Sequence, residues 1–314
     1  MAKVRGDHLV VLVIPVILTC LVSSGSRLIS QDRKASVSMP EVVRLTNDEE
    51  FEHRPVWHPD GKRIVFARHE DGGNSIHLYI MDAAPGARPV RITTRKQPEY
   101  DAVVSPDGKQ VLFSAVAVSG TQGNLDIASV PLDGKSEPKI VAGDVDGKLS
   151  HQDWPAWFPD GKRFLFSSTQ DGNQEIYVGS MEEGTAPERL TQSPGQDVHP
   201  ALSPDSAYVL FATDRWGGLE LARLELKDRS IVRITESPGL DDYPSISPDG
   251  QRWVYVSNRS GNSDIWLGST TGPPRQLTDT PEPEFFPSFS NDGKTIVFVS
   301  ARQGQSDIYM MKAP

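Results

Sequence analysis

The stretch YPSISPDGQRWVYVSNRSGNSDIW, from Tyr243 to Trp266, is one of six versions of the same phrase in a chain of 314 residues. Each version contains a Pro-Asp-Gly turn or a close variant of it. The turn aspartates are Asp60, Asp107, Asp160, Asp205, Asp249 and Asp292. By subtraction of these numbers, they lie 47, 53, 45, 44 and 43 residues apart. Such a period has to be explained before any single motif is interpreted.

The residues around each turn predict four short strands per repeat. Proline presets φ at the second turn position, and glycine accepts a positive φ at the exit. The turn is followed by an apolar, β-branched run such as WVYVS, then by a run such as SDIWLG, and then by Arg-Leu-Thr or a variant. Four strands in about 45 residues are typical of a β-propeller blade, so six repeats predict six blades.

The two ends of the repeat region indicate how the ring closes. An Arg-Leu-Thr strand near Val42 to Thr46 precedes the first turn and has no blade of its own, whereas the last blade supplies three strands before Pro314. The N-terminal strand should therefore complete the last blade, which removes an exposed strand edge. We predict an all-β fold, a six-bladed propeller over residues 42–314 with four antiparallel strands per blade.

The repeat resembles a known family. Its pattern of Pro-x-aromatic-Ser-Pro-Asp-Gly-Lys, a strand ending in Phe, then Asp-Ile-Tyr and Leu-Thr is similar to the TolB-type propeller repeat, over nearly the whole chain after residue 41. The resemblance implies a six-bladed propeller in the bacterial periplasm, where TolB binds the lipoprotein Pal and the membrane-anchored TolA. TolB carries an α/β domain before its propeller, and here a linker of about fifteen residues stands in that place, so the resemblance leaves a Tol–Pal role open.

The amino terminus predicts export to the periplasm or cell envelope. Lys3 and Arg5 precede an apolar run from Leu9 to Val22 and then Ser-Ser-Gly-Ser, which is the order of a secretory signal. The run is shorter than the roughly 20 residues of a spanning helix. We expect a signal peptide over residues 1–25 and a linker over 26–41. Lipidation of Cys20 is the less favoured alternative, because Thr19 precedes it and the apolar run continues beyond it.

Composition and motifs exclude several classes of function. The formal net charge is −10 and the basic residues are scattered, which argues against nucleic acid as a partner. The sequence contains no Gly-x-Ser-x-Gly elbow, no His-Glu-x-x-His and no phosphate-binding glycine loop. We therefore favour a non-catalytic protein over an enzyme and expect no cofactor, apart from the divalent metal considered below. We also expect a monomer.

The loops that enter the innermost strands carry the candidate binding residues. Five of the six positions that lie eight residues before the turn aspartate are carboxylates, Glu52, Glu99, Asp197, Asp241 and Glu284, and the sixth is Gln152. Beside them stand the further rim candidates His53, Asp153, His199 and Asp242. Such a rim suits a protein or peptide partner, for example an envelope lipoprotein, and predicts a binding scaffold with an acidic channel mouth. The competing interpretation is that each carboxylate accepts hydrogen bonds within its own loops, and repetition in nearly every blade favours it.

One sector of the rim suggests an alternative function. His151, Asp153, Asp197 and His199 lie in two adjacent blades and are ligand types that suit zinc, manganese or iron. A divalent metal there would make the chain a metal-assisted propeller enzyme of the lactonase or uronate-lyase type. We favour the binding scaffold over this alternative, because a loop histidine is more often hydrogen-bonded than metal-bound.

Overall fold

The computed structural model describes residues 39–70, 75–117, 124–143 and 150–314. Residues Met39–Pro314 belong to one compact unit. The predicted signal peptide, nearly all of the predicted linker and Cys20 lie outside the described residues. Within the described ranges, no helix is long and apolar enough to cross a membrane.

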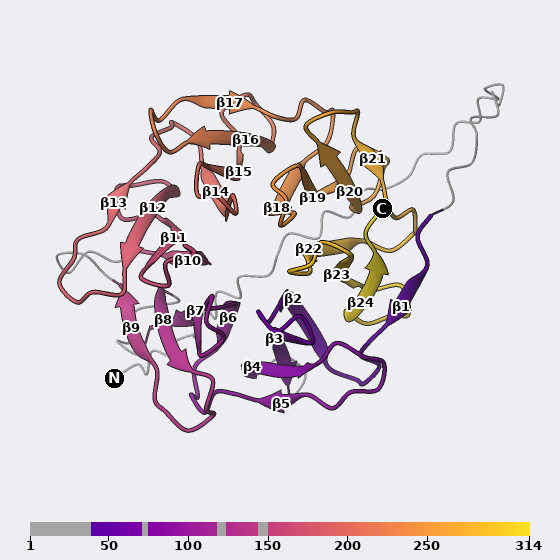
Figure 1. Ribbon diagram of the computed structural model, residues 1–314, viewed down its shortest axis with the longest axis horizontal. Coiled ribbons are helices and arrows are strands. Elements are labelled where there is room, and N and C mark those ends of the chain that lie inside the picture. The colour runs from indigo at the N-terminus through magenta and orange to yellow at the C-terminus, as the bar shows by residue number, and fades with distance from the viewer. Residues whose placement is uncertain (1–38, 71–74, 118–123, 144–149) are drawn as a thin grey trace, which may run out of the picture. The chain divides into compact units, whose positions relative to one another are not determined.

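Six antiparallel sheets of four strands each surround a central axis (Figure 1). The first blade comprises β2 (Phe51–Trp57), β3 (Arg63–Glu70), β4 (Ser75–Asp82) and β5 (Val90–Arg91). The second comprises β6 (Glu99–Val104), β7 (Gln110–Val116), β8 (Leu125–Pro131) and β9 (Lys139–Ala142). The third comprises β10 (Gln152–Trp157), β11 (Arg163–Ser168), β12 (Glu175–Ser180) and β13 (Glu188–Arg189).

The remaining blades repeat this order. The fourth comprises β14 (Asp197–Leu202), β15 (Tyr208–Thr213), β16 (Glu220–Glu225) and β17 (Ile231–Arg233). The fifth comprises β18 (Asp241–Ile246), β19 (Arg252–Ser257), β20 (Asp264–Ser269) and β21 (Arg275–Gln276). The sixth comprises β22 (Glu284–Phe289), β23 (Thr295–Ser300), β24 (Asp307–Lys312) and, from the other end of the chain, β1 (Val42–Arg44). The predicted six-bladed fold is confirmed.

The closure of the ring also follows the prediction. Strand β1 pairs antiparallel with β24, with Val42 opposite Met311 and Arg44 opposite Tyr309. The backbone N–H of Leu45 donates to the carbonyl of Ile308 at 2.8 Å. The N-terminal strand therefore covers the outer edge of the last blade, which would otherwise present unpaired backbone groups.

The turn chemistry is the one that the repeat predicts. In the fifth blade, the carboxylate of Asp249 accepts from the N–H of Gln251 at 2.9 Å, and Gly250 has a φ of 68°. In the fourth blade, Ser206 occupies the glycine position with a φ of 56°. The position therefore requires the left-handed region, which glycine adopts without strain and serine does not.

The core consists of apolar layers between neighbouring blades. The six aromatics at equivalent positions of the second strands are fully buried, and they are Phe66, Phe113, Phe166, Phe211, Tyr255 and Phe298. Each such side chain contributes about 1.5–3 kcal/mol when it leaves water. Because both faces of a blade are covered by its neighbours, the second strands are apolar on both faces rather than alternating.

Every innermost strand contains one irregularity that shapes the channel. Its pairing with the second strand shifts register near the middle, as between His53 and Val56 in blade 1. The residue at this bulge has a positive φ, between 46° and 55°, in all six blades; these residues are Arg54, Asp101, Trp154, His199, Tyr243 and Phe286. A bulge of this kind redirects a side chain, and here it supplies one residue per blade to the central channel.

Candidate functional site: the axial channel

The six bulge residues, which we call the axial plug, pack across the channel. The ring of His199 lies 4.1 Å from that of Trp154 and 4.5 Å from that of Tyr243. The rings of Tyr243 and Phe286 are 4.7 Å apart. The guanidinium of Arg54 lies 4.1 Å over the Trp154 ring. Trp154 and Phe286 belong to opposite blades and are 5.9 Å apart, so the plug spans the axis.

A cavity of about 220 Å³, the axial funnel, adjoins the plug. Five plug residues line it, together with the residues that follow them on the same strands, including Val56, Ala156, Leu202, Ile246 and Ser288. Four prolines also line it, Pro55, Pro200, Pro244 and Pro287. The funnel therefore has rigid walls of small and apolar residues and a floor of aromatic rings and one guanidinium.

Several titratable groups lie within the plug or beside it. Asp101 accepts a hydrogen bond from the hydroxyl of Ser114 at 2.9 Å, and Arg54 Nη1 lies 3.7 Å from its Oδ1. Asp153 Oδ2 accepts from the Gln174 amide at 3.1 Å, while its buried Oδ1 has no partner among the described residues. Burial, with the Asp101 carboxylate as the next cause, raises the pKa of Asp153 to about 7.

His53, beside the plug, and His199, a member of it, differ in their surroundings. Burial lowers the pKa of His53 to about 4, despite the nearby Asp101 carboxylate. Its ring lies 4.2 Å from that of Phe286. His199 instead has a carboxylate partner, because its Nδ1 lies 2.5 Å from Oδ1 of Asp242. His199 is therefore paired, whereas His53 Nδ1 is buried without a hydrogen-bond partner among the described residues.

The five rim carboxylates predicted from the sequence lie inside the blades. Glu52 is 2% exposed and the other four are fully buried. Arg259 donates to Asp241 at 2.6 Å, and Arg68 donates to Glu52 at 2.7 Å. Asp197 and Glu284 are bound in the same way by Arg215 and Arg302. This geometry favours the bracing role over an open acidic rim, and any part of these carboxylates in binding a partner stays a prediction.

The arginine partners are the residues that sequence reasoning missed. Arg215, Arg259 and Arg302 each follow their carboxylate by 18 residues, directly after the second strand. This fixed spacing was the available signal. Glu99 is the exception, because Thr93 donates to it and no arginine lies within ion-pairing distance among the described residues. Burial raises the pKa of Glu99 to about 7.

The Arg-Leu-Thr motif closes a second repeated contact. In the third blade, Glu175 at the start of β12 accepts from Thr191 Oγ1 at 2.7 Å and from Arg189 Nη2 at 3.0 Å. In the fourth, Glu220 accepts in the same way from Thr235 at 2.7 Å and Arg233 at 3.0 Å. The motif is therefore a clasp between the third and fourth strands.

The candidate metal ligands are not gathered into one site. Asp197 pairs with Arg215, His199 with Asp242 and Asp153 with Gln174. The backbone N–H of His151 donates to Thr169 at 2.9 Å. Across the described part of the chain, no group of three or more His, Cys, Asp or Glu residues is placed to hold a metal ion. The sector named by the sequence therefore does not form a coordination sphere.

These features define a six-bladed propeller with a plugged channel and internally braced blades. The family model of the TolB beta propeller domain matches residues 145–237 and 222–314, which together make up more than half of the chain. The chain therefore belongs to the TolB β-propeller family.

Individual relatives share little sequence with this chain. An uncharacterized protein of Agrobacterium fabrum strain C58 is 31% identical over 80 residues, which cover 26% of this chain and 27% of that protein's length. A propeller structure assigned as TolB, from Agrobacterium tumefaciens, has a TM-score of 0.66 at 23% identity and covers 88% of this chain and 99% of that one. A gluconolactonase of Xanthomonas campestris has a TM-score of 0.67 at 14% identity and covers 88% and 90%. Both structures support the fold alone.

Proposed function

We propose that the chain is an exported binding module that takes a side chain or loop of a protein partner into the axial funnel. The observation that carries this proposal is the funnel itself, a rigid recess on the axis with an aromatic and guanidinium floor. Its volume of about 220 Å³ is below the roughly 300–1,000 Å³ of typical small-molecule pockets. A recess of this size suits one or two side chains of a larger partner.

The rigidity of the recess supports a binding role. The walls belong to five innermost strands fixed by their blades, and four of the wall residues are prolines. A preformed site loses little conformational freedom on binding, so more of the contact energy appears as affinity. Aromatic rings and arginine are also the side chains that most often dominate protein interfaces.

Export and the family give the setting of this proposal. The signal sequence expected over residues 1–25 would deliver the chain to the periplasm or cell envelope. Membership of the TolB propeller family agrees with a protein partner. The partner we propose is a protein of the same compartment.

The catalytic alternative has less support. The likeness to a gluconolactonase rests on 14% identity and carries the fold alone. Three of the four candidate ligands, Asp197, His199 and Asp153, contact other side chains. Metal analysis of the purified chain before and after chelation tests this alternative. A stoichiometric metal that His199→Ala removes would support it.

The proposal is tested by photo-crosslinking from the funnel wall. A photoreactive amino acid would replace Ser288, which lines the funnel, and in a matched control it would replace Val232, an exposed residue of β17. In envelopes of cells that produce each variant, we expect a discrete protein adduct from position 288 and none of that mass from position 232. The proposal fails if position 288 gives no protein adduct, or if both positions give the same adducts.

A further inference from the structure

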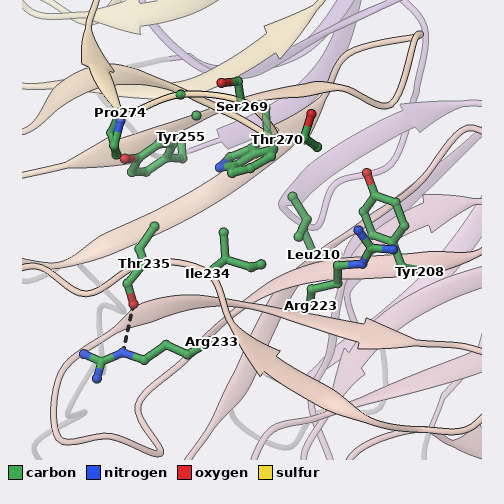
Figure 2. Close-up of a pocket in the computed structure, with 13 residues that line it drawn as sticks. Tyr208, Leu210, Arg223, Arg233, Ile234, Thr235, Tyr255, Ser269, Thr270 and Pro274 are labelled. Atoms are coloured by element: carbon green, nitrogen blue, oxygen red, sulfur yellow. Dashed lines mark hydrogen bonds between the residues drawn. The ribbon is translucent and has the colours of Figure 1, made fainter.

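A second cavity lies between the fourth and fifth blades, apart from the axial funnel (Figure 2). Its volume of about 360 Å³ falls within the roughly 300–1,000 Å³ of small-molecule sites. One wall comes from β15, β16, Arg233 at the end of β17 and the two residues after it, and the other from β19, β20 and the loop after β20. We call this cavity the interblade pocket.

Arg223 occupies a position that is not charged in any other blade. It pairs with Leu210 of the second strand, and the same register position can be read in each sheet. The equivalent residues are Ile80, Ser129, Val178, Leu267 and Met310. Four of these five are aliphatic or methionine, as expected for a layer between two blades. Only the fourth blade places a guanidinium there.

Thr270 marks a second departure at the same interface. Its backbone N–H donates to the carbonyl of the residue before the second strand, as do the equivalent residues in every other blade. Those equivalents are Ala83, Leu132, Met181, Leu226 and Ala313, and all of them pack against interblade apolar clusters. Thr270 is exposed and lines the pocket instead.

Trp253 is the third departure. Its equivalents on the second strands are Ile64, Val111, Phe164, Val209 and Ile296, none of which carries a polar side-chain atom. The indole fits only because Gly268 is opposite, since a Cβ on Gly268 would lie 2.2 Å from Nε1. Nε1 is buried and has no acceptor among the described residues.

The third blade is a natural comparison, because it also sets an aromatic ring against glycine. There, Phe164 faces Gly179, and Met181 packs against the cluster that contains Phe164. Blade 5 has Thr270 where blade 3 has Met181. The interblade pocket is therefore a property of particular residues and not of the repeat.

Two hydrogen-bond donors of the pocket, Trp253 and Arg223, are weakly engaged, whereas Arg233 is paired with Glu220. The indole N–H of Trp253 lacks an acceptor, and Arg223 holds its guanidinium 3.8 Å over the Tyr208 ring (Figure 2). Glu225 lies 2.6 Å from Arg223 Nε, but both side chains are about one-third exposed, at 34% and 32%. A pair with that exposure is weak, so a ligand anion can compete with Glu225 for the guanidinium.

We infer that the interblade pocket binds a small ring compound that carries a carboxylate, either an acidic sugar or an aromatic acid. The carboxylate is received by Arg223, whose planar donor fork matches it, and the indole N–H of Trp253 supplies a further donor. The ring lies in the slot against the aromatic walls of Tyr208 and Trp253. The chain's net charge of −10 opposes anions at long range, but salt screens it over about 8 Å.

The test is calorimetric titration of the purified full chain with D-glucuronate and with 4-hydroxybenzoate, each beside its neutral counterpart, glucose or phenol. We expect saturable binding of one acid and binding of its neutral counterpart that is weaker by about tenfold or more. Binding of glucuronate alone identifies an acidic sugar as the ligand class, and binding of hydroxybenzoate alone identifies an aromatic acid. If neither acid binds, the inference is wrong.

Variants drawn from the other blades place the binding in the pocket. Arg223→Leu copies the fifth blade, Thr270→Met copies the third, and Trp253→Phe removes only the indole donor. We expect each to weaken binding, the first two by about tenfold or more, while Glu225→Gln strengthens it by freeing the guanidinium. Lys109→Leu, which makes the same charge change on an exposed side chain of the second blade, should leave binding unchanged. Equal binding by wild type and Arg223→Leu would overturn the assignment.

Discussion

Two sets of six residues stand two positions apart on the same innermost strands. In the first set, which begins with Glu52, five residues are carboxylates and all six are buried. In the axial plug, which begins with Arg54, the six residues are all of different types. The backbone is the same in every blade, so the difference lies in the side chains. Repetition indicates groups that brace each blade, and variation is what the proposed binding surface would show.

Backbone strain strengthens this contrast. All six plug residues have a positive φ, which costs a non-glycine residue of order 1 kcal/mol or more. Glycine would adopt this conformation without strain, yet none of the six positions has it. The side chains at these positions therefore contribute something that offsets the strain, and their mutual packing across the axis is the visible part of it.

The largest expected effect concerns closure of the ring. Deleting residues 27–47 removes β1, and with it the contacts of Arg44 and Thr46 to the buried Asp307. Unpaired burial of a charge costs about 3–5 kcal/mol, and the edge of β24 is exposed as well, so the melting temperature should fall markedly. Deleting residues 27–40 keeps β1 and should change it little. Equal melting temperatures would contradict the closure.

A smaller loss of stability is expected when one brace is broken. Arg259→Leu leaves Asp241, which is fully buried, without its partner and should destabilise the fold by about 3 kcal/mol in urea unfolding. Lys109→Leu breaks an exposed pair with Asp107 and should cost less than about 1 kcal/mol. If the two variants unfold alike, the repeated carboxylates do not brace the blades.

The pH dependence of stability should include a contribution from Glu99, the rim carboxylate without an arginine, as it should from Glu52, whose pKa burial also raises to about 7. The folded-state pKa of Glu99 is raised from 4.5 to about 7. A raised folded pKa contributes stability that is present below pH 4.5 and lost as the pH rises through about 7. Relative to Glu99→Gln, the wild-type chain should therefore lose up to about 3 kcal/mol over this window. Parallel stability curves for the two proteins from pH 4.5 to 7.5 would show that Glu99 is not perturbed.

The smallest effect is expected at the turns. Ser206→Gly relieves a positive φ and should be neutral or stabilise the fold by up to about 1 kcal/mol. Gly250→Val introduces a β-branched residue at a φ of 68° and should destabilise it by a similar amount or more. Thermal melts measure both changes, and a harmless Gly250→Val would mean that this turn tolerates side chains.

The fold could be predicted from the sequence because the same strand-and-turn pattern repeats six times along the chain. The Pro-Asp-Gly period, the apolar second strands and the unpaired strand at Val42 to Thr46 all follow from local rules of turns and burial, and the structure repeats them. The candidate site was less accessible. The rim positions were aligned correctly on their strands, but whether a carboxylate faces solvent or an arginine depends on contacts between residues 18 apart.

Two further features lay beyond local patterns. The bulge that turns Trp154 and Phe286 toward the axis depends on a register shift between strands, which no residue type announces. The interblade pocket depends on volumes summed over two blades, with Gly268 and Thr270 on one side and Arg223 on the other. When the repeats are aligned by strand register, each exceptional residue of the interblade pocket can be compared with the five residues at the equivalent position in the other blades.

The most direct measurement of the central claim compares three proteins by the photo-crosslink from position 288. These are the parent chain, the double variant Asp197→Asn with Asp241→Asn, and Trp154→Leu. If the repeated carboxylates brace the blades and the axial plug binds the partner protein, the double variant should melt at a lower temperature and keep the adduct. Trp154→Leu should then stay folded and lose the adduct. A double variant that loses the adduct at unchanged stability, beside a Trp154→Leu variant that keeps it, would contradict the account.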